Sequence, residues 1–235
     1  MLASLGVQAQ PVAEECVVLV HGLARTPHSM NRMHKQLGAA GYRVINQGYP
    51  SRRYPIEQLL DRSIGAGLEA CGALGFEKAH FVTHSLGGIL LRAWARQHSS
   101  DAIGRVVMLG PPNQGSQVVD RFQRMPGYRW INGPAGLQLG TDADSLPRSL
   151  GPVDFELGII AGTRSINLIL STALPNPDDG KVSVEATRVE GMRELVTVPV
   201  SHPFLMKNRT VIQHTLHFLR YGRFGRSSGA DPAAG

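Results

Sequence analysis

The sequence predicts an α/β protein in which a mostly parallel sheet of about six strands is covered by helices on both faces. Two observations lead to this prediction. Short runs of apolar and β-branched residues alternate with longer segments whose apolar residues recur at helical spacing. Runs of the first kind suit strands that are buried on both faces, which are typical of parallel sheets.

The expected strands are rich in Val, Leu and Ile, and they cover residues 16–20, 42–45, 79–83, 105–109, 157–161 and 194–200. The expected helices lie between and after them, over residues 27–40, 56–74, 86–97 and 204–221. In the first helix, Met30, Met33 and Leu37 share one face, and Gly41 lies just past the end. Two internal glycines, Gly65 and Gly67, weaken the second helix.

A chain of 235 residues is long enough for one domain with a sizeable core. We expect this domain over residues 16–222, after a flexible start or signal-peptide remnant (1–15) and before a disordered tail (223–235). Val7-Gln8-Ala9 has the small-x-small pattern of a signal-peptidase site, although a charged n-region is missing. We therefore expect a periplasmic or secreted protein, with a cytoplasmic one as the alternative.

The net charge of +6 comes mostly from arginine. It could attract the chain to anionic surfaces such as lipid head groups, or it could reflect scattered, solvated arginines. No basic run interleaved with aromatic residues is present, so we expect no nucleic-acid partner. No apolar stretch reaches the roughly 18 residues that a membrane span needs. We expect a monomer that makes at most transient contact with lipid.

Between residues 116 and 152 the alternation of strands and helices stops. Gly, Pro, Asp and Ser are frequent there, and the apolar residues are scattered. Loops of this length in a compact domain are usually functional. We expect a small cap over the site, and the alternative is a surface excursion with its own apolar cluster.

The stretch Phe81–Gly88 has the pattern of a nucleophile elbow, in which a serine occupies a tight turn between a strand and a helix. Such a turn exposes the hydroxyl of Ser85 and places the N–H of Leu86 beside it. A glycine such as Gly87 fits where the helix passes close to the strand. The usual first glycine of the pattern is replaced by Thr83.

The first strand ends in His21-Gly22-Leu23. A strand that ends in His-Gly, about seventy residues before a candidate elbow, is typical of the loop that supplies the second oxyanion-binding N–H. We assign that role to Leu23, alongside Leu86. The oxyanion hole would stabilise the negative charge that develops on a carbonyl oxygen during attack.

Serine needs a general base, and the base needs an acid that fixes its tautomer. His202 lies in the loop after the last expected strand, and Asp179 precedes that strand. Asp178 is the adjacent alternative to Asp179, and the weaker candidates are Asp142, Asp144 and Asp154. The order Ser85, Asp179, His202 predicts a catalytic triad.

Several other polar or turn-forming segments also follow expected strands, so they should meet at one edge of the sheet. The residues that we expect to shape a substrate-binding site there are His21, Gly22, His84, Pro111, Pro112 and Asn113. His-Glu clusters and the pattern Cys-x-x-Cys are absent, so we expect no metal and no other cofactor. The two cysteines, Cys16 and Cys71, could form a disulfide or remain buried free thiols.

These motifs resemble the α/β-hydrolase superfamily in its small lipase and esterase branch. The segments that carry the resemblance are 17–23, 83–88, 178–182 and 201–203. The chain is also similar to a bacterial subgroup of predicted acetyltransferases and hydrolases, in which Gly-Pro-Pro-Asn-x-Gly-Ser and Asp-Asp-Gly-Lys-Val-Ser-Val segments occur. The resemblance extends from about Cys16 to Tyr221 and implies the α/β-hydrolase fold with a small cap.

The expected activity is hydrolysis of a carboxylic ester or lipid through an acyl-enzyme. An acyltransferase or a thioesterase with the same triad is a second enzymatic alternative. A non-catalytic binding protein on the same fold is the alternative from another class, and a metal hydrolase is disfavoured.

Overall fold

The expected strands form one six-stranded sheet in the computed structural model, which describes residues 15–143, 145–165 and 174–225. All strand pairs are parallel, and the order across the sheet is β2-β1-β3-β4-β5-β6. The strands are β1 (Cys16–Val20), β2 (Arg43–Gln47), β3 (Ala79–His84), β4 (Ile103–Leu109), β5 (Leu157–Gly162) and β6 (Glu194–Val198). The predicted fold class is therefore confirmed.

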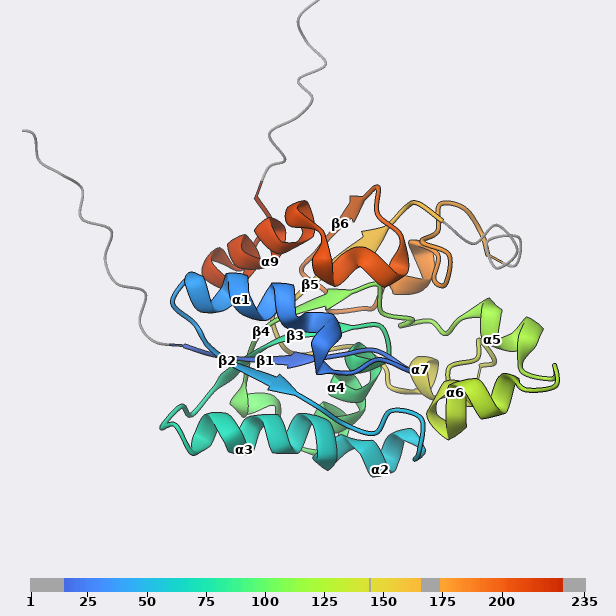
Figure 1. Ribbon diagram of the computed structural model, residues 1–235, viewed down its shortest axis with the longest axis horizontal. Helices are drawn as coiled ribbons and strands as arrows, with labels where there is room; N and C mark the ends of the chain where they lie inside the picture. Colours follow the sequence, from blue (N-terminus) through green and yellow to red (C-terminus); the bar gives the residue numbers. More distant parts are fainter. Residues whose placement is uncertain (1–14, 144, 166–173, 226–235) are drawn as a thin grey trace, which may run out of the picture.

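Helices cover both faces of this sheet (Figure 1). One face carries α1 (Asn31–Ala39), preceded by a 3-10 turn (Pro27–Met30), and α9 (Arg209–Tyr221). The other carries α2 (Ile56–Leu60), α3 (Ala66–Gly72) and α4 (Leu86–Gln97). A π-helical turn (Asp61–Gly65) joins α2 to α3. Short 3-10 turns lie at Ser100–Ala102, Glu185–Thr187 and His202–Lys207.

The alternation of side chains along β1 shows why both faces need helices. Val17 and Leu19 pack into the core on the α1 and α9 side, whereas Val18 and Val20 pack against α2, α3 and α4. All four side chains have 0% exposure. Successive residues of a strand point to opposite faces, so a continuous apolar run is buried only when both faces are covered.

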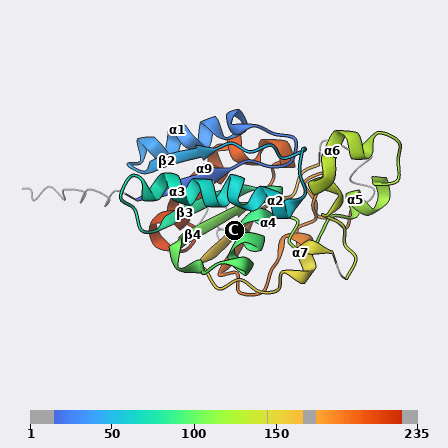
Figure 2. The ribbon, with the colours of Figure 1, turned by 90° about the horizontal axis from the view of Figure 1, so that it is seen from below.

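The segment predicted as a cap contains three helices beyond one end of the sheet. They are α5 (Gln117–Phe122), α6 (Tyr128–Leu137) and α7 (Leu146–Ser149). Both views show these three helices together on the right, at one end of the sheet (Figures 1 and 2). Gly133 has a non-helical backbone (φ 66°, ψ −175°), so α6 is interrupted before Pro134.

The start of the last helix differs from the prediction. We expected a helix from Phe204, but α9 begins at Arg209, after a 3-10 segment. Asn208 has an extended backbone, and its side-chain oxygen accepts a hydrogen bond of 3.1 Å from the N–H of Val211. An asparagine in this geometry is an N-cap, which fixes the helix start.

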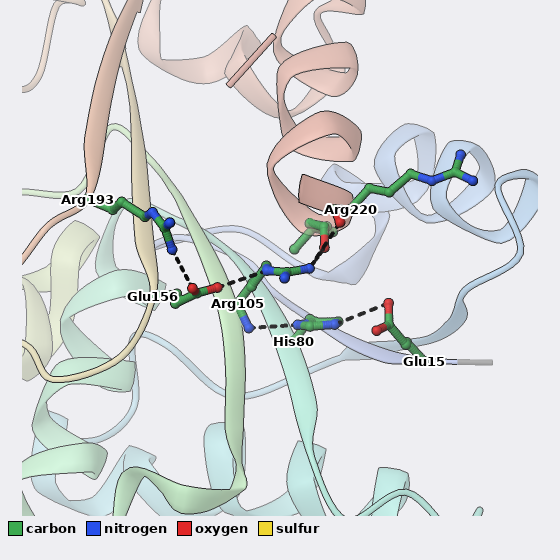
Figure 3. A network of polar contacts seen from close by, with 7 residues as sticks. Glu15, His80, Arg105, Glu156, Arg193 and Arg220 are labelled. Carbon is green, nitrogen blue, oxygen red and sulfur yellow. Dashed lines mark hydrogen bonds and ion pairs between the residues drawn. The ribbon is translucent and has the colours of Figure 1, made fainter. Parts of the chain in front are cut away.

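A polar network joins the beginnings of several strands to the end of α9 (Figure 3). The N–H of Arg105 donates to Nδ1 of His80 at 2.7 Å, and the Arg105 side chain donates to Glu156 at 2.8 Å. The same guanidinium donates to the carbonyl of Leu219 at 2.9 Å. Exposed ion pairs contribute little to stability, but this network ties β3 and β4 to the last turn of α9.

Cys16 and Cys71 form a disulfide across 55 residues, with their Cα atoms 5.9 Å apart. It connects the first residue of β1 to α3, which covers that side of the sheet. In the described residues no helix is long and apolar enough to cross a membrane. The predictions for residues 1–14, Asp144 and residues 226–235 lie outside the part of the chain that the structure describes.

Reducing the disulfide should destabilise the fold. The crosslink limits the freedom of the unfolded chain, so we expect its loss to lower the free energy of unfolding by about 2–4 kcal/mol. Urea denaturation of the wild type with and without reductant measures this change. The Cys16→Ser/Cys71→Ser variant is the control, because reductant should leave its unfolding curve unchanged. Equal curves for oxidised and reduced wild type would contradict the prediction.

The contact between α3 and β1 requires a glycine at position 67. A Cβ there would lie 2.5 Å from Cγ1 of Val18, whereas a Cβ at Gly72 in the same helix would meet nothing within 4 Å. We expect Gly67→Ala to lower the free energy of unfolding by about 1–3 kcal/mol through overpacking. Gly72→Ala, measured in the same urea titration, should be neutral or stabilising. Similar effects of the two substitutions would rule out this steric account.

Candidate active site

Ser85 lies where the order of the strands reverses. The chain runs from β1 outward to β2 and then returns to β3 on the other side of β1. In open parallel sheets, a crevice forms at the carboxyl ends of the strands at such a switch point. Leu23 follows β1 and Ser85 follows β3, so the topology brings both to this crevice.

The backbone of Ser85 is held in an unusual conformation, with φ 53° and ψ −120°. Of the described residues other than glycine, only Ala24 also has a positive φ. The N–H of Ser85 donates to the carbonyl of Leu109 at 3.0 Å, and its carbonyl accepts from the N–H of Gly88 at 3.0 Å. Backbone strain of this kind is found at functional sites, and here it turns the serine side chain out of the sheet.

Two glycines allow the chain to approach this turn closely. A Cβ at Gly87 would lie 2.7 Å from the carbonyl oxygen of Val20. A Cβ at Gly22 would lie 2.7 Å from Nδ1 of His84 and 3.1 Å from Cβ of Ser85. The loop after β1 therefore lies directly against the serine, and no larger residue fits at either position.

Asp179 and His202 form a buried pair at the ends of β5 and β6. Nδ1 of His202 lies 2.7 Å from Oδ2 of Asp179, and their exposures are 3% and 1%. The other carboxylate oxygen accepts from the N–H groups of Lys181 and Val182 at 3.0 and 2.9 Å. The backbone N–H of His202 donates to the carbonyl of Asp179 at 2.9 Å. An ionised carboxylate only accepts, so His202 donates from Nδ1 and keeps a lone pair on Nε2.

The carboxylate of the neighbouring residue, Asp178, bonds the backbone of its own turn. Oδ1 of Asp178 accepts from the N–H of Gly180 at 2.7 Å, which closes the turn. Gly110 (φ 54°) makes room for the Asp179–His202 pair, because a Cβ there would lie 3.0 Å from Oδ2 of Asp179. The geometry thus places Asp179, and not Asp178, against the histidine.

Two backbone N–H groups beside Ser85 are available to a ligand. Those of Leu23 and Leu86 make no hydrogen bond to any other residue that the structure describes. Leu86 is the first residue of α4, where helical N–H groups have no partner within the helix. Leu23 lies in the loop that Gly22 holds against the serine. The two N–H groups are the donors expected for an oxyanion hole.

Ser85 and His202 open into one cavity of about 240 Å³. Part of its wall comes from the predicted cap, which contributes Ser116, Val118, Val119, Tyr128, Asn132, Gly136 and Leu139. The rest comes from the loops after the strands, which contribute Leu23, Arg25, His84, Pro112, Lys181 and Val182. Burial raises the pKa of Tyr128 to about 12, so its hydroxyl remains a donor at neutral pH.

His84 is a fixed neighbour of His202. Their rings lie 4.7 Å apart, and Nε2 of His84 lies 3.1 Å from the carbonyl oxygen of His202. Burial, together with nearby His202, lowers the pKa of His84 well below its usual value. The ring is therefore neutral at pH 7 and donates from Nε2, which holds the His202 backbone in place.

The residues expected to shape the substrate site divide into two groups. His84 and Pro112 line the cavity, and Gly22 lies against Ser85. His21, Pro111 and Asn113 are not among its lining residues, and we correct their assignment. The amide of Asn113 is fully buried and donates to the carbonyl of Thr187 at 2.7 Å. His21 stacks on Tyr49 with ring centroids 4.3 Å apart.

Sequence reasoning missed several lining residues and one buried support. Arg25, Tyr128 and Lys181 line the cavity. Arg25 lies two residues after Leu23, and Lys181 lies two residues after Asp179. Their positions in these loops could have marked them as residues near the site. Arg92 of α4 is 4% exposed and donates to the carbonyls of Asn113, Pro147 and Gly151 at 3.1, 3.0 and 2.7 Å. It thus connects the elbow helix to α7 and the loop that follows it.

In the part of the chain that the structure describes, no group of three or more His, Cys, Asp or Glu side chains could hold a metal ion. His84 and His202 lie close together, but Nε2 of His84 contacts the carbonyl of His202 and Nδ1 of His202 contacts Asp179.

Two solved structures that share this architecture are named as lipases. The mature form of the Bacillus licheniformis lipase BlEst2 superimposes with a TM-score of 0.67 at 20% identity, covering 90% of this chain and 93% of the lipase. A monoacylglycerol lipase from Paleococcus ferrophilus gives a TM-score of 0.60 at 16% identity, covering 88% and 93% of the two chains. The chain has the α/β-hydrolase fold.

Sequence comparison agrees with the α/β-hydrolase fold. The chain is 29% identical over 120 residues to 2-hydroxy-6-oxo-6-phenylhexa-2,4-dienoate hydrolase from Burkholderia cepacia and 28% identical to the enzyme of that name from Comamonas testosteroni. The matched segment covers 48% of this chain and 41% of either relative's length. No protein-family model matches the sequence.

The hydrogen bonds of the two adjacent carboxylates predict different effects of removing their charges. Asp179→Asn should slow phosphonylation of Ser85 by a fluorophosphonate by about a thousandfold or more, because the wrong histidine tautomer is stabilised. Asp178→Asn keeps its acceptor oxygen and should change the labelling rate by less than about tenfold. Mass spectrometry of the labelled protein over time gives both rates. Equal rates in the two variants would show that Asp179 does not orient His202.

Proposed function

We propose that this protein is a serine hydrolase that cleaves carboxylic esters through an acyl-enzyme. One observation carries the proposal: a serine in a strained turn shares a cavity with a histidine whose other nitrogen bonds a buried carboxylate. This arrangement supplies the nucleophile, the general base and the residue that orients the base.

In the proposed first step, Oγ of Ser85 attacks the ester carbonyl carbon and its proton passes to Nε2 of His202. Asp179 stabilises the imidazolium that forms, and the N–H groups of Leu23 and Leu86 bind the oxyanion. The carbon–oxygen bond to the alcohol then breaks, and the proton on His202 goes to the leaving oxygen. Water activated by His202 hydrolyses the acyl-enzyme in the second half of the reaction.

The apolar residues in the cavity wall favour an acyl group as the part of the substrate that lies near Ser85. Val118, Val119 and Leu139 lie on the cap side of the cavity. Apolar side chains of this kind bind hydrocarbon, because its removal from water is favourable. The structures from Bacillus licheniformis and Paleococcus ferrophilus are named as a lipase and a monoacylglycerol lipase, which is consistent with this assignment.

Two enzymatic alternatives use the same groups. An acyltransferase or thioesterase would form the same acyl-enzyme and differ in the donor or in the nucleophile that resolves it. The relatives from Burkholderia cepacia and Comamonas testosteroni are named for a substrate with a ketone and a carboxylate in place of an ester. The alternative from another class is a non-catalytic binding protein. Labelling with a fluorophosphonate distinguishes it from an enzyme, because only an activated serine reacts.

The direct test is hydrolysis of a p-nitrophenyl ester series from acetate to palmitate. We expect activity in the wild type and a loss of at least about a thousandfold in kcat for Ser85→Ala. Ser99→Ala, which removes an exposed hydroxyl at the opposite end of α4 from Ser85, is the matched control and should retain full activity.

The chain-length profile would then distinguish an esterase from a lipase. Activity that persists in Ser85→Ala would exclude the proposed nucleophile. A wild type that reacts with the fluorophosphonate at Ser85 but hydrolyses no ester would favour a thioester or ketone substrate.

A further inference from the structure

Two cations face the same cavity as Ser85, and neither belongs to the proposed catalytic machinery. Arg25 and Lys181 both line the cavity, and both side chains are exposed to solvent at its wall. None of the lining residues is an aspartate or glutamate. Within the described residues, neither cation forms an ion pair. The wall of the cavity therefore carries two cations and no carboxylate.

Arg25 is attached to the loop that supplies one oxyanion donor. Its N–H donates to the carbonyl of Gly22 at 3.2 Å, which closes a turn over residues 22–25. Within this turn, Ala24 has a positive φ of 54°, and its N–H donates to Oγ of Ser51 at 3.1 Å. The base of the Arg25 side chain is thus fixed relative to Gly22, which lies against Ser85.

Lys181 is attached to the turn that holds the acid of the triad. Its N–H donates to Oδ1 of Asp179 at 3.0 Å, and its carbonyl accepts from Oγ of Ser116 at 2.9 Å. Both bonds fix its backbone between the Asp179–His202 pair and the start of the cap. Although the side chain keeps contact with solvent, partial burial in the cavity lowers the pKa of Lys181, and nearby Arg25 lowers it further.

Arg25 also lines a second cavity, whose wall carries further cations. It is about 510 Å³ in volume, and its wall includes Arg25, Arg52, Arg53 and Trp130. No carboxylate is among its lining residues. Cations without nearby acids in a concave surface raise the local concentration of anions and strengthen their binding. The surface on both sides of Arg25 is therefore suited to a negatively charged group and unsuited to a positive one.

We propose that Arg25 and Lys181 form an anion subsite that selects ester substrates carrying a carboxylate or a phosphate near the scissile bond. The proposal rests on the proposed ester hydrolysis at Ser85 and names its substrate class. Arg25 would contact the anion from the oxyanion side and Lys181 from the side of Asp179. Arginine binds carboxylate and phosphate through paired hydrogen bonds, and lysine binds them as a point charge.

The kinetic test compares charged esters with their neutral counterparts. 4-Nitrophenyl hemiglutarate and its methyl ester test a carboxylate, and 1-decanoyl-glycerol 3-phosphate and 1-decanoyl-glycerol test a phosphate. We expect the wild type to prefer the charged member of at least one pair, and the responding pair identifies the source of the anion. The ratio of kcat/KM, charged over neutral, should fall about tenfold in Arg25→Gln and in Lys181→Gln.

Lys35→Gln is the matched control, because it removes one exposed positive charge from α1, away from the cavity. It should leave both ratios unchanged. If Arg25→Gln and Lys181→Gln lower kcat/KM equally for charged and neutral esters, the proposal is overturned. The cations would then act on the transition state and not on the charge of the substrate. A wild type without any charge preference would overturn it as well.

A binding experiment separates this proposal from the proposed activity. Octyl phosphate, octanoate and octanol are titrated calorimetrically into Ser85→Ala, with and without Arg25→Gln and Lys181→Gln. We expect the anions to bind about tenfold more tightly than octanol, and each added substitution to remove most of that difference. Selective anion binding without hydrolysis of any ester would retain the subsite and reject the activity. Ester hydrolysis that depends on Ser85, without selective anion binding, would retain the activity and reject the subsite.

Discussion

The close approach of the backbones after β1 and β3 is the constraint on which the site depends. Gly87 lies so near the carbonyl of Val20, and Gly22 so near Ser85, that a Cβ at either position would overlap its neighbour. This approach places two unpaired N–H groups and the strained serine within one crevice. Without it, the N–H of Leu23 would not lie beside Ser85, and Leu86 would be left as the single donor there.

Asp179 and His202 are positioned by a different device, a turn whose backbone N–H groups bond the Asp179 carboxylate. Asp179 accepts two backbone N–H groups on one oxygen and faces His202 with the other. The hydrogen bonds fix the carboxylate before any substrate is present, so little reorganisation is needed when charge develops on the histidine. His84 adds a neutral ring that holds the His202 backbone from the opposite side.

The two parts of the site have different origins in the fold. Ser85, Leu23 and the Asp179–His202 pair lie in segments that follow strands, which the sheet places with little freedom. The cavity wall comes from the loops and from α5 and α6, which can vary without disturbing the sheet. In our proposal, substrate preference depends on residues such as Arg25, Lys181 and Val119, because fold similarity alone does not fix it.

By itself the sequence determined the fold class, the order of the strands along the chain and the position of the elbow, because these follow from local apolar runs and turn residues. It named Ser85, Asp179 and His202 from the elbow pattern, their positions relative to expected strands and their order. Only the tertiary structure decided that Asp179 and not Asp178 faces His202, that Asn113 supports the fold, and that Arg25 and Lys181 meet at one cavity. Contacts between residues far apart in the chain depend on how loops pack, and no local pattern encodes that packing.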